Sequence, residues 1–112
     1  MIKIIARLRR NPDLTPEAFR DYWTNVHVPL IKSKLPGLRH YAGCFPVHDA
    51  RVGADRTLED DAIIELGFDD VETMHAQMND PAFLTPERTA SSAHLMVLSY
   101  TKSVVVEVVD VL

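Results

Sequence analysis

The stretch "FRDYWTNVHVPL", residues 19–30, decides the fold and raises the question of function. Its apolar residues recur at spacings of three and four, which is typical of one face of an α-helix. They are Phe19, Tyr22, Trp23, Val26 and Leu30. The same spacing places His27 on this apolar face. A buried polar side chain needs a hydrogen-bond partner, so His27 has either a structural partner or a chemical task.

The flanking residues indicate where this helix begins and ends. Thr15 is suited to cap its N-terminus, and Pro16 fits the first turn, where the missing N–H is not needed. Pro29 lies further along, where a proline removes a backbone donor, so we expect it to kink or restart the helix. The sequence "LPGL", residues 35–38, ends it.

Four other segments have the composition of β-strands, rich in Ile, Val and aromatic residues. They cover residues 2–8, 38–48, 61–68 and 95–112. Pro46 in the second segment predicts an edge strand or a bulge, because proline cannot donate to a ladder. The fourth segment is long, with a potential break near Lys102 or Ser103.

A second helix is predicted over residues 69–80, with Asp69 or Asp70 as its N-cap and one apolar face. That face consists of Val71, Met74 and Met78. Residues 49–59 read as a polar loop, either functional or disordered. Residues 82–94 are expected to be irregular or to form a short helix.

The resulting order, β-α-β-β-α-β, predicts an α+β, ferredoxin-like domain over residues 1–112. This plan has a four-stranded antiparallel sheet, helices on one face, and the first and third strands in the middle. The strands are apolar on both faces, as in the pairs Ile4–Ile5 and Ile63–Ile64. The helix-free face must then be covered as well, and a second copy of the chain is the simplest cover, so we expect a homodimer.

The bulk composition of the 112 residues excludes several classes of protein. The chain has 12 Lys and Arg against 16 Asp and Glu, a net charge of −4, which argues against a general nucleic-acid binder. Its single cysteine, Cys44, excludes an internal disulfide. No apolar run approaches the roughly 18 residues of a membrane helix, and no secretory signal is visible, so we expect a cytoplasmic protein without a membrane partner.

Several motifs resemble the EthD family of dimeric α+β barrels. The most specific is F-x-x-Y-W-x-x-x-H-x-P-L over residues 19–30, followed by "LPGLRHY" at residues 35–41. The segments "DDAIIELGFDDVETM", residues 60–74, and "SYTKSVVVEVV", residues 99–109, are similar to the third strand, second helix and last strand of that family. The match covers nearly the whole chain, apart from the loop around Gly53 and residues 84–92.

The resemblance implies a homodimer whose two sheets pack face to face into a closed barrel, with a pocket between sheet and helices in each subunit. The wider superfamily includes muconolactone-type isomerases, cofactor-free polyketide cyclases and dehydratases, and small monooxygenases. Because one fold hosts all these activities, the fold alone does not fix the function.

His27 and Tyr41 are the candidate catalytic residues. An imidazole moves protons near neutral pH, and an apolar setting disfavours its charged form, so His27 is suited to be a general acid or base. Tyr41 could polarise a substrate carbonyl or pass a proton. The alternative for His27 is a core histidine bonded to a carbonyl freed by Pro29, and for Tyr41 a half-buried strand residue.

Four further side chains are candidates for binding a hydrophobic substrate, namely Trp23, Tyr22, Phe45 and Glu65. The aromatic ones could line an aromatic-substrate pocket, or could simply pack the helix on the sheet. Glu65 could act as a second acid or base if it points inward, and otherwise is a solvated strand residue.

We expect neither a metal nor an organic cofactor. His40, Cys44 and His48 share one strand face, but residues four apart along a strand lie roughly 13 Å apart and cannot share one ion. Cys44 reads as a small buried hydrophobe, and His75 as a residue at the edge of the core. No phosphate-binding glycine loop, dinucleotide fingerprint or serine elbow is present.

Three functions fit these residues. The first is a small cofactor-independent enzyme, an isomerase, cyclase or dehydratase/lyase, that acts by acid/base catalysis on a hydrophobic ring-containing or carbonyl-bearing molecule of a catabolic or secondary-metabolic pathway. The second is a non-catalytic ligand-binding or accessory protein of a degradation pathway. The third is a cofactor-free monooxygenase. Whether His27 faces an open cavity or is packed solid separates the first from the second.

Overall fold

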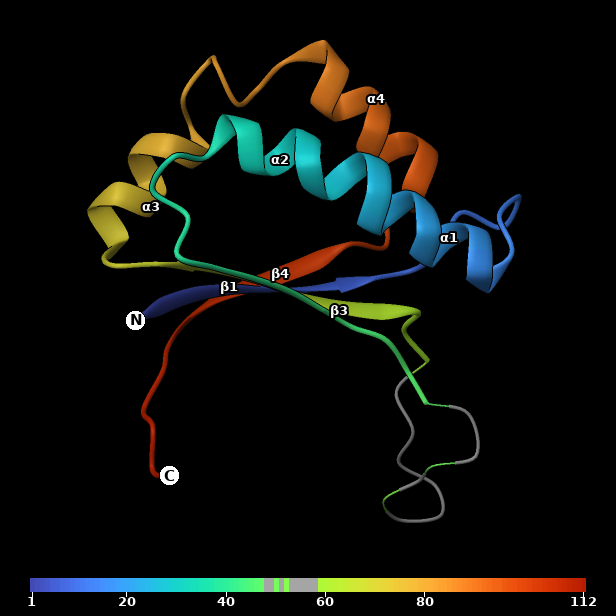
Figure 1. Cartoon of the computed structure of the whole chain (residues 1–112), viewed down its shortest axis with the longest axis horizontal. Coiled ribbons are helices and arrows are strands. Elements are labelled where there is room, and N and C mark those ends of the chain that lie inside the picture. The colour runs from blue at the N-terminus through green and yellow to red at the C-terminus, as the bar shows by residue number, and fades with distance from the viewer. Residues whose placement is uncertain (48–49, 51, 53–58) are drawn as a thin grey trace.

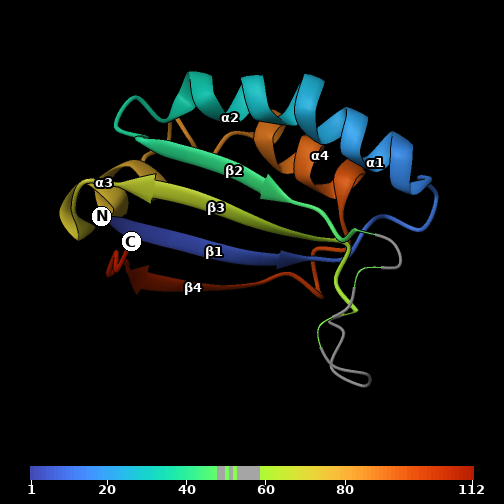
Figure 2. The ribbon, with the colours of Figure 1, turned by 60° about the horizontal axis from the view of Figure 1, so that its bottom comes forward.

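The computed structural model describes residues 1–47, 50, 52 and 59–112. It contains a four-stranded antiparallel sheet of order β2-β3-β1-β4, with all helices on one face (Figures 1 and 2). The strands are β1 (Ile2–Leu8), β2 (His40–Cys44), β3 (Ala62–Phe68) and β4 (Lys102–Glu107). The predicted α+β, ferredoxin-like plan is confirmed, with β1 and β3 in the middle. His48 and most of the predicted loop at 49–59 lie outside the described residues.

The helical layer begins with one unbroken helix of three segments. These are α1 (Pro16–Tyr22), the π-helical turn η1 (Trp23–His27) and α2 (Val28–Lys34). Thr15 caps the first segment, as predicted, because its side chain accepts a hydrogen bond from the Ala18 N–H. The layer is completed by α3 (Val71–Met78) and α4 (Pro86–Leu95).

The expected restart of the helix at Pro29 does not occur, because the π turn immediately before it accommodates the proline. Pro29 cannot donate to the carbonyl of Asn25 and would crowd it in a regular α-helix. The N–H of Val28 instead reaches back five residues, to the Trp23 carbonyl. The helix therefore continues through Pro29 with one widened turn.

This π turn also determines which side chains face the sheet. The buried residues of the long helix and its C-cap follow a strict spacing of four, namely Phe19, Trp23, His27, Ile31 and Leu35. In a pure α-helix this spacing would drift around the axis, but a π turn holds one extra residue and cancels the drift. The prediction for Val26 is wrong for the same reason, since its side chain is turned outward and is 48% exposed.

Of the two alternatives expected for residues 82–94, an irregular connection or a short helix, the structure has the helix, the ten-residue α4. Its start repeats that of α1, because "LTPE" occurs at residues 14–17 and again at 84–87, and Thr85 caps it as Thr15 caps α1. Its apolar periodicity is weak, because its buried residues are Ser91, Ser92 and Leu95. Because two of these buried residues are polar, the sequence shows no clear helical spacing of apolar residues here.

Two further expectations need correction. The last strand begins only at Lys102, after an isolated bridge between Met96 and Arg10 and a turn. Val71 does not face the core, because it is the first residue of α3 and is 40% exposed, whereas Met74 is buried as predicted.

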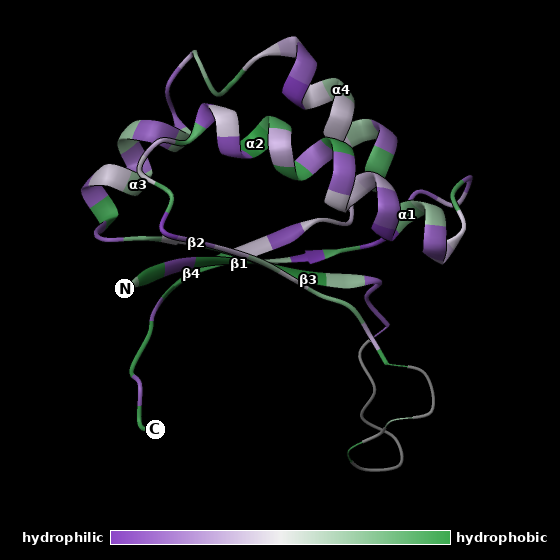
Figure 3. Ribbon diagram, viewed as in Figure 1, coloured by the Kyte–Doolittle hydropathy of each residue, from purple (hydrophilic) through white to green (hydrophobic). Residues whose placement is uncertain are grey.

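The two faces of the sheet differ in their cover. Ile64, Phe68 and their neighbours on one face are buried under the helices. The other face carries no helix, and the chain after β4 projects away from the sheet on that side with hydrophobic residues exposed (Figures 1 and 3). Within the described ranges, none of the helices is long and apolar enough to cross a membrane.

Candidate active site

A cavity of about 320 Å³ lies between the sheet and the helical layer. Aliphatic side chains of β1 and β3, including Ile4, Leu8 and Ile64, form its floor. An engineered cavity of ~150 Å³ binds benzene, so this space is large enough for a molecule of about two rings. A mostly apolar cavity with a few polar groups is the usual form of a small-molecule site.

His27 lines this cavity from the π turn and is only 6% exposed. Its Nδ1 lies 2.9 Å from the hydroxyl oxygen of Ser91 on α4. Burial, and secondarily the positive charge of Arg88, lower the pKa of His27 to about 4. The imidazole is therefore neutral near pH 7.

Ser91 links His27 to the outside of the helical layer. Its hydroxyl oxygen also lies 3.1 Å from the phenol oxygen of Tyr22. Since a serine hydroxyl both donates and accepts, Nδ1 can be the acceptor or the donor of its bond. In the described part of the chain, Nε2 of His27 makes no hydrogen bond, so it is available to a molecule in the cavity as the complementary donor or acceptor.

Tyr41 and Trp23 lie in the same cavity as His27. Tyr41 comes from β2, and its ring packs edge-on against Trp23 with 5.5 Å between centroids. Burial raises the pKa of Tyr41 above its usual value, so its phenol stays protonated and can donate a hydrogen bond. The fold thus brings Tyr41 of β2 together with Trp23 and His27 of the long helix.

Tyr22 and Phe45 lie outside this cavity. The Tyr22 ring packs at a tilt against His94, with 4.4 Å between centroids, and lines a groove on the outer surface. Phe45 packs edge-on against Trp23, at 5.5 Å, and beside Phe19, at 6.1 Å. Phe45 supports Trp23 in the cavity wall, whereas Tyr22 bonds to Ser91, the partner of His27. Neither Tyr22 nor Phe45 lines the cavity itself.

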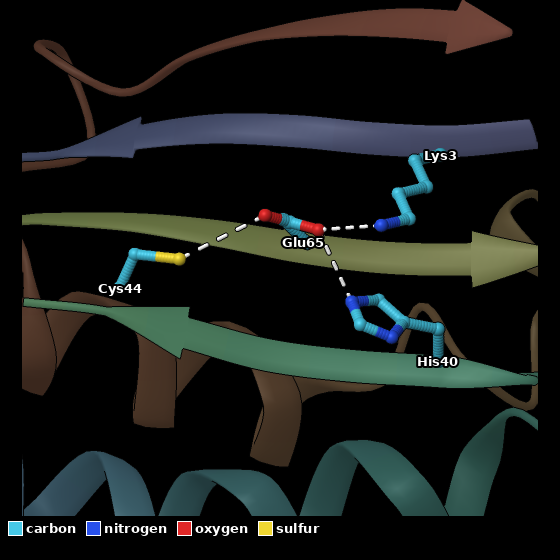
Figure 4. Close-up of polar contacts among 4 residues, drawn as sticks. All are labelled: Lys3, His40, Cys44 and Glu65. Carbon is cyan, nitrogen blue, oxygen red and sulfur yellow. Dashed lines mark hydrogen bonds and ion pairs between the residues drawn. The ribbon is translucent and has the colours of Figure 1, made fainter. Parts of the chain in front are cut away.

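Glu65 lies on the helix-free face of the sheet and is not brought to His27. Its carboxylate accepts hydrogen bonds from Lys3 Nζ at 2.7 Å and from His40 Nε2 at 3.1 Å (Figure 4). Lys3, the largest influence, lowers the pKa of Glu65. The Sγ of Cys44 lies 3.7 Å from its second oxygen.

Cys44 was expected to be buried, and this is wrong, because the sheet edge leaves it exposed. Partial desolvation and the Glu65 carboxylate raise the pKa of its thiol, which makes it a poor nucleophile. Within residues 1–47, 50, 52 and 59–112, no cluster of three or more His, Cys, Asp or Glu side chains is placed to hold a metal ion.

Sequence reasoning missed three residues of the site, all on α4. Ser91 bonds to His27, while Ser92 and Arg88 line the cavity. The signal that identifies them is the Thr85–Pro86 helix start, because a helix beginning there places residues 88, 91, 92 and 95 on one face.

The fold and the cavity together define a ferredoxin-like α+β domain with a mostly apolar cavity between sheet and helices, bordered by a neutral histidine. The family model "EthD domain" matches residues 11–88, and the chain belongs to the EthD family. No curated protein matches it.

Solved structures similar to this chain include the following three. An EthD family protein from Bacillus halodurans is 27% identical, with 97% of this chain and 99% of that one covered and a TM-score of 0.63. A dimeric ferredoxin-like protein of unknown function from Thermobifida fusca is 20% identical, with 96% and 90% covered and a TM-score of 0.62. SnoaB, a cofactor-independent oxygenase from Streptomyces nogalater, is 14% identical, with 99% and 95% covered and a TM-score of 0.61. The last two likenesses show the fold alone.

Proposed function

We propose that the protein is a small cofactor-independent enzyme that performs acid/base catalysis on a hydrophobic, carbonyl-bearing molecule in the cavity. The observation that carries this proposal is the position of His27, which borders an open cavity instead of being packed solid. Isomerisation, cyclisation and dehydration all need little more than a placed proton donor and acceptor in a site without bulk water.

The reaction begins with removal of a proton from the carbon beside the carbonyl. Nε2 of His27 accepts this proton, and the electron pair of the broken C–H bond moves onto the carbonyl oxygen as an enolate. The protonated phenol of Tyr41 donates a hydrogen bond to that oxygen. Return of the proton to another atom of the substrate completes an isomerisation, while Ser91 accepts the Nδ1–H and holds the ring in place.

Two other functions use the same cavity. A cofactor-free monooxygenase would begin with the same proton removal and then react the anion with O₂, and the structural neighbour SnoaB is described as a cofactor-independent oxygenase. A ligand-binding protein of a degradation pathway is favoured by the low pKa of His27, because a base with a pKa of about 4 is weak in the empty cavity.

We further propose that the protein is a homodimer through the helix-free face of the sheet. Val104 on this face is 57% exposed, and the register places it beside Ile5. Val109 and Val111, in the segment after β4, are 78% and 85% exposed. A second copy would cover this apolar surface and the unpaired edges, and the Thermobifida fusca neighbour is described as dimeric.

Exchange of carbon-bound protons tests the enzyme proposal before the substrate is known. Cyclohexanone and the two tetralones carry exchangeable protons beside a carbonyl, and NMR in D₂O measures the rate of their replacement. We expect the protein to accelerate exchange of at least one ketone, and His27→Ala to lower that acceleration roughly 10²–10⁴-fold. His75→Ala, on the exposed side of α3, is the matched control and should exchange like the wild type.

Two results would argue against catalysis. One is an exchange rate that His27→Ala leaves unchanged, and the other is no acceleration with any ketone, which would favour the ligand-binding protein. Loss of the fold should not confuse the test. His27→Ala enlarges an existing cavity, and Ser91 keeps its bond to Tyr22, so no buried hydroxyl is left without a partner.

A further inference from the structure

Among the described residues, Arg88 in the wall of the cavity is a cation without a counterion. It is half-buried at the third residue of α4, and its guanidinium stacks on the Phe83 ring, 4.6 Å from the centroid. Its Nε is buried and has no hydrogen-bond partner within the described ranges. By contrast, Arg7 and Arg39 each pair with an aspartate.

The cavity around Arg88 supplies nothing to balance its charge. The described residues that line it include no Asp or Glu, and its other ionisable groups are His27 and Tyr41. Near pH 7 both of these are neutral, so the cavity has a net charge of +1. A partly desolvated guanidinium that lacks a partner is unfavourable unless something that enters the cavity pairs with it.

A guanidinium has the geometry to bind a carboxylate. Its planar fork of N–H donors matches the two oxygens of a carboxylate, and stacking on an aromatic ring fixes the plane of the fork. Arg88 and His27 line the same cavity, and the charge of Arg88 acts on the imidazole. A molecule held by Arg88 therefore lies next to the proposed base.

We infer that the ligand of this cavity is a hydrophobic, ring-sized molecule bearing a carboxylate, which pairs with the Arg88 guanidinium while the apolar part fills the space under His27. This inference rests on the proposed function for the site but narrows it to one substrate class, the hydrophobic organic acids. A bound carboxylate also cancels the field of Arg88, the smaller of the two influences that lower the pKa of His27.

Matched pairs of acids and amides test the charge without changing the shape of the ligand. Calorimetric titration measures binding of adamantane-1-carboxylate, cyclohexanecarboxylate and 2-naphthoate, each beside its carboxamide. We expect at least one carboxylate to bind, roughly tenfold to a hundredfold more tightly than its amide, as is usual for charge-assisted hydrogen bonds. Arg88→Gln should remove this preference, so that acid and amide bind with similar affinity, whereas Arg88→Lys should keep part of it.

Arg20→Gln is the matched control. Arg20 also stacks on an aromatic ring, 4.9 Å from the Phe45 centroid, but it lines a different depression and is exposed. This variant loses the same charge and should keep the wild-type preference. Arg88→Gln should fold, because glutamine three residues after the Thr85 N-cap forms a capping box for α4.

Three outcomes would overturn the inference. They are equal affinity for acid and amide, no binding of any carboxylate in the panel, and an unchanged preference in Arg88→Gln. The inference and the proposed function fail on different measurements. If the protein binds a ligand but has no activity, it should still prefer the acid through Arg88, and His27→Ala should keep that preference in the same titrations. If the protein is an enzyme whose ligand carries no carboxylate, the preference is absent, but the exchange of protons in the uncharged ketones remains.

Discussion

Protonation of His27 should make the folded protein sensitive to mild acid. In an unfolded chain the histidine pKa is about 6.5, whereas burial beside Arg88 lowers the pKa of His27 to about 4. Between these values the unfolded chain binds a proton that the folded chain does not bind. The free energy of unfolding therefore falls as the pH drops from about 6.5 to about 4, and below that range the loss reaches its limit.

The size of this effect follows from the gap between the two pKa values. At ~1.4 kcal/mol per pH unit, a gap from 6.5 to about 4 corresponds to roughly 3 kcal/mol. Domains of this size are stable by about 5–15 kcal/mol in total, so protonation of this one histidine removes a substantial share of that stability. The free-energy cost of protonating His27 in the folded protein comes first from desolvation of the imidazolium and second from the charge of Arg88.

Urea titrations between pH 7.5 and 4 measure the effect in the wild type and in His27→Gln. The glutamine is uncharged throughout this range and its amide can still bond to Ser91, so we expect the variant to lose about 3 kcal/mol less stability than the wild type over this interval. The pKa values of Asp60, Glu65 and Asp70 are lowered, and the stability they contribute is lost as the pH falls through those values. Their effect is common to both proteins and cancels in the difference.

His75→Gln is the control for this experiment. It makes the same substitution as His27→Gln, but at an exposed position on α3. We expect it to follow the wild-type curve. Parallel curves for the wild type and His27→Gln would refute the reasoning, since they would mean that His27 takes up its proton in the folded protein as readily as in the unfolded chain. All titrations need one protein concentration, because dimerisation would otherwise shift the apparent stability.

Two other predictions concern the cavity wall and the sheet. A Cβ added at Gly43 would lie 2.6 Å from the Trp23 ring, so Gly43→Ala should push the indole towards the cavity. We expect this to cost about 1–3 kcal/mol of stability and to shift the fluorescence of the single tryptophan. An unchanged spectrum and melting temperature would contradict this packing. Sedimentation of the wild type should give twice the monomer mass of 12.6 kDa, and Val104→Glu should shift the protein towards monomer. Val26 is 48% exposed on the helical side, so Val26→Glu should remain dimeric. A wild type that sediments only as monomer would refute the homodimer.

The strands and the first helix could be predicted because their signals are local. Short runs rich in Ile mark β1 and β3, and the Thr15–Pro16 start marks α1, so the strand order followed from topology alone. The position of His27 was also accessible, because a spacing of four from Trp23 places it on the same side. The outward turn of Val26 was not, since it depends on one widened turn before Pro29 that hydrophobic spacing does not encode.

The site residues of α4 escaped prediction for a different reason. A helix is usually found through its apolar face, and the buried face of α4 presents Ser91, Ser92 and Leu95. Arg88 was not predicted as a site residue either, because an arginine in a polar segment is normally solvated. Only the tertiary structure places it in a cavity. Likewise, only the pairing of β3 shows that Glu65 belongs to Lys3 and His40 on the opposite face of the sheet.

The polar buried face of α4 is itself an argument for function. Two serines contribute little to a hydrophobic core, and α4 would bury more apolar surface if alanine or leucine stood at these positions. The hydroxyl of Ser91 is instead satisfied by His27 and Tyr22, two polar groups of the facing helix, and Arg88 is left with no partner in the described chain. A helix selected only for packing would need neither the hydrogen-bonded imidazole nor the unpaired cation. The features of α4 that lower its fit to the core are thus the ones that line the cavity and orient its chemistry, as expected where stability is given up for a site.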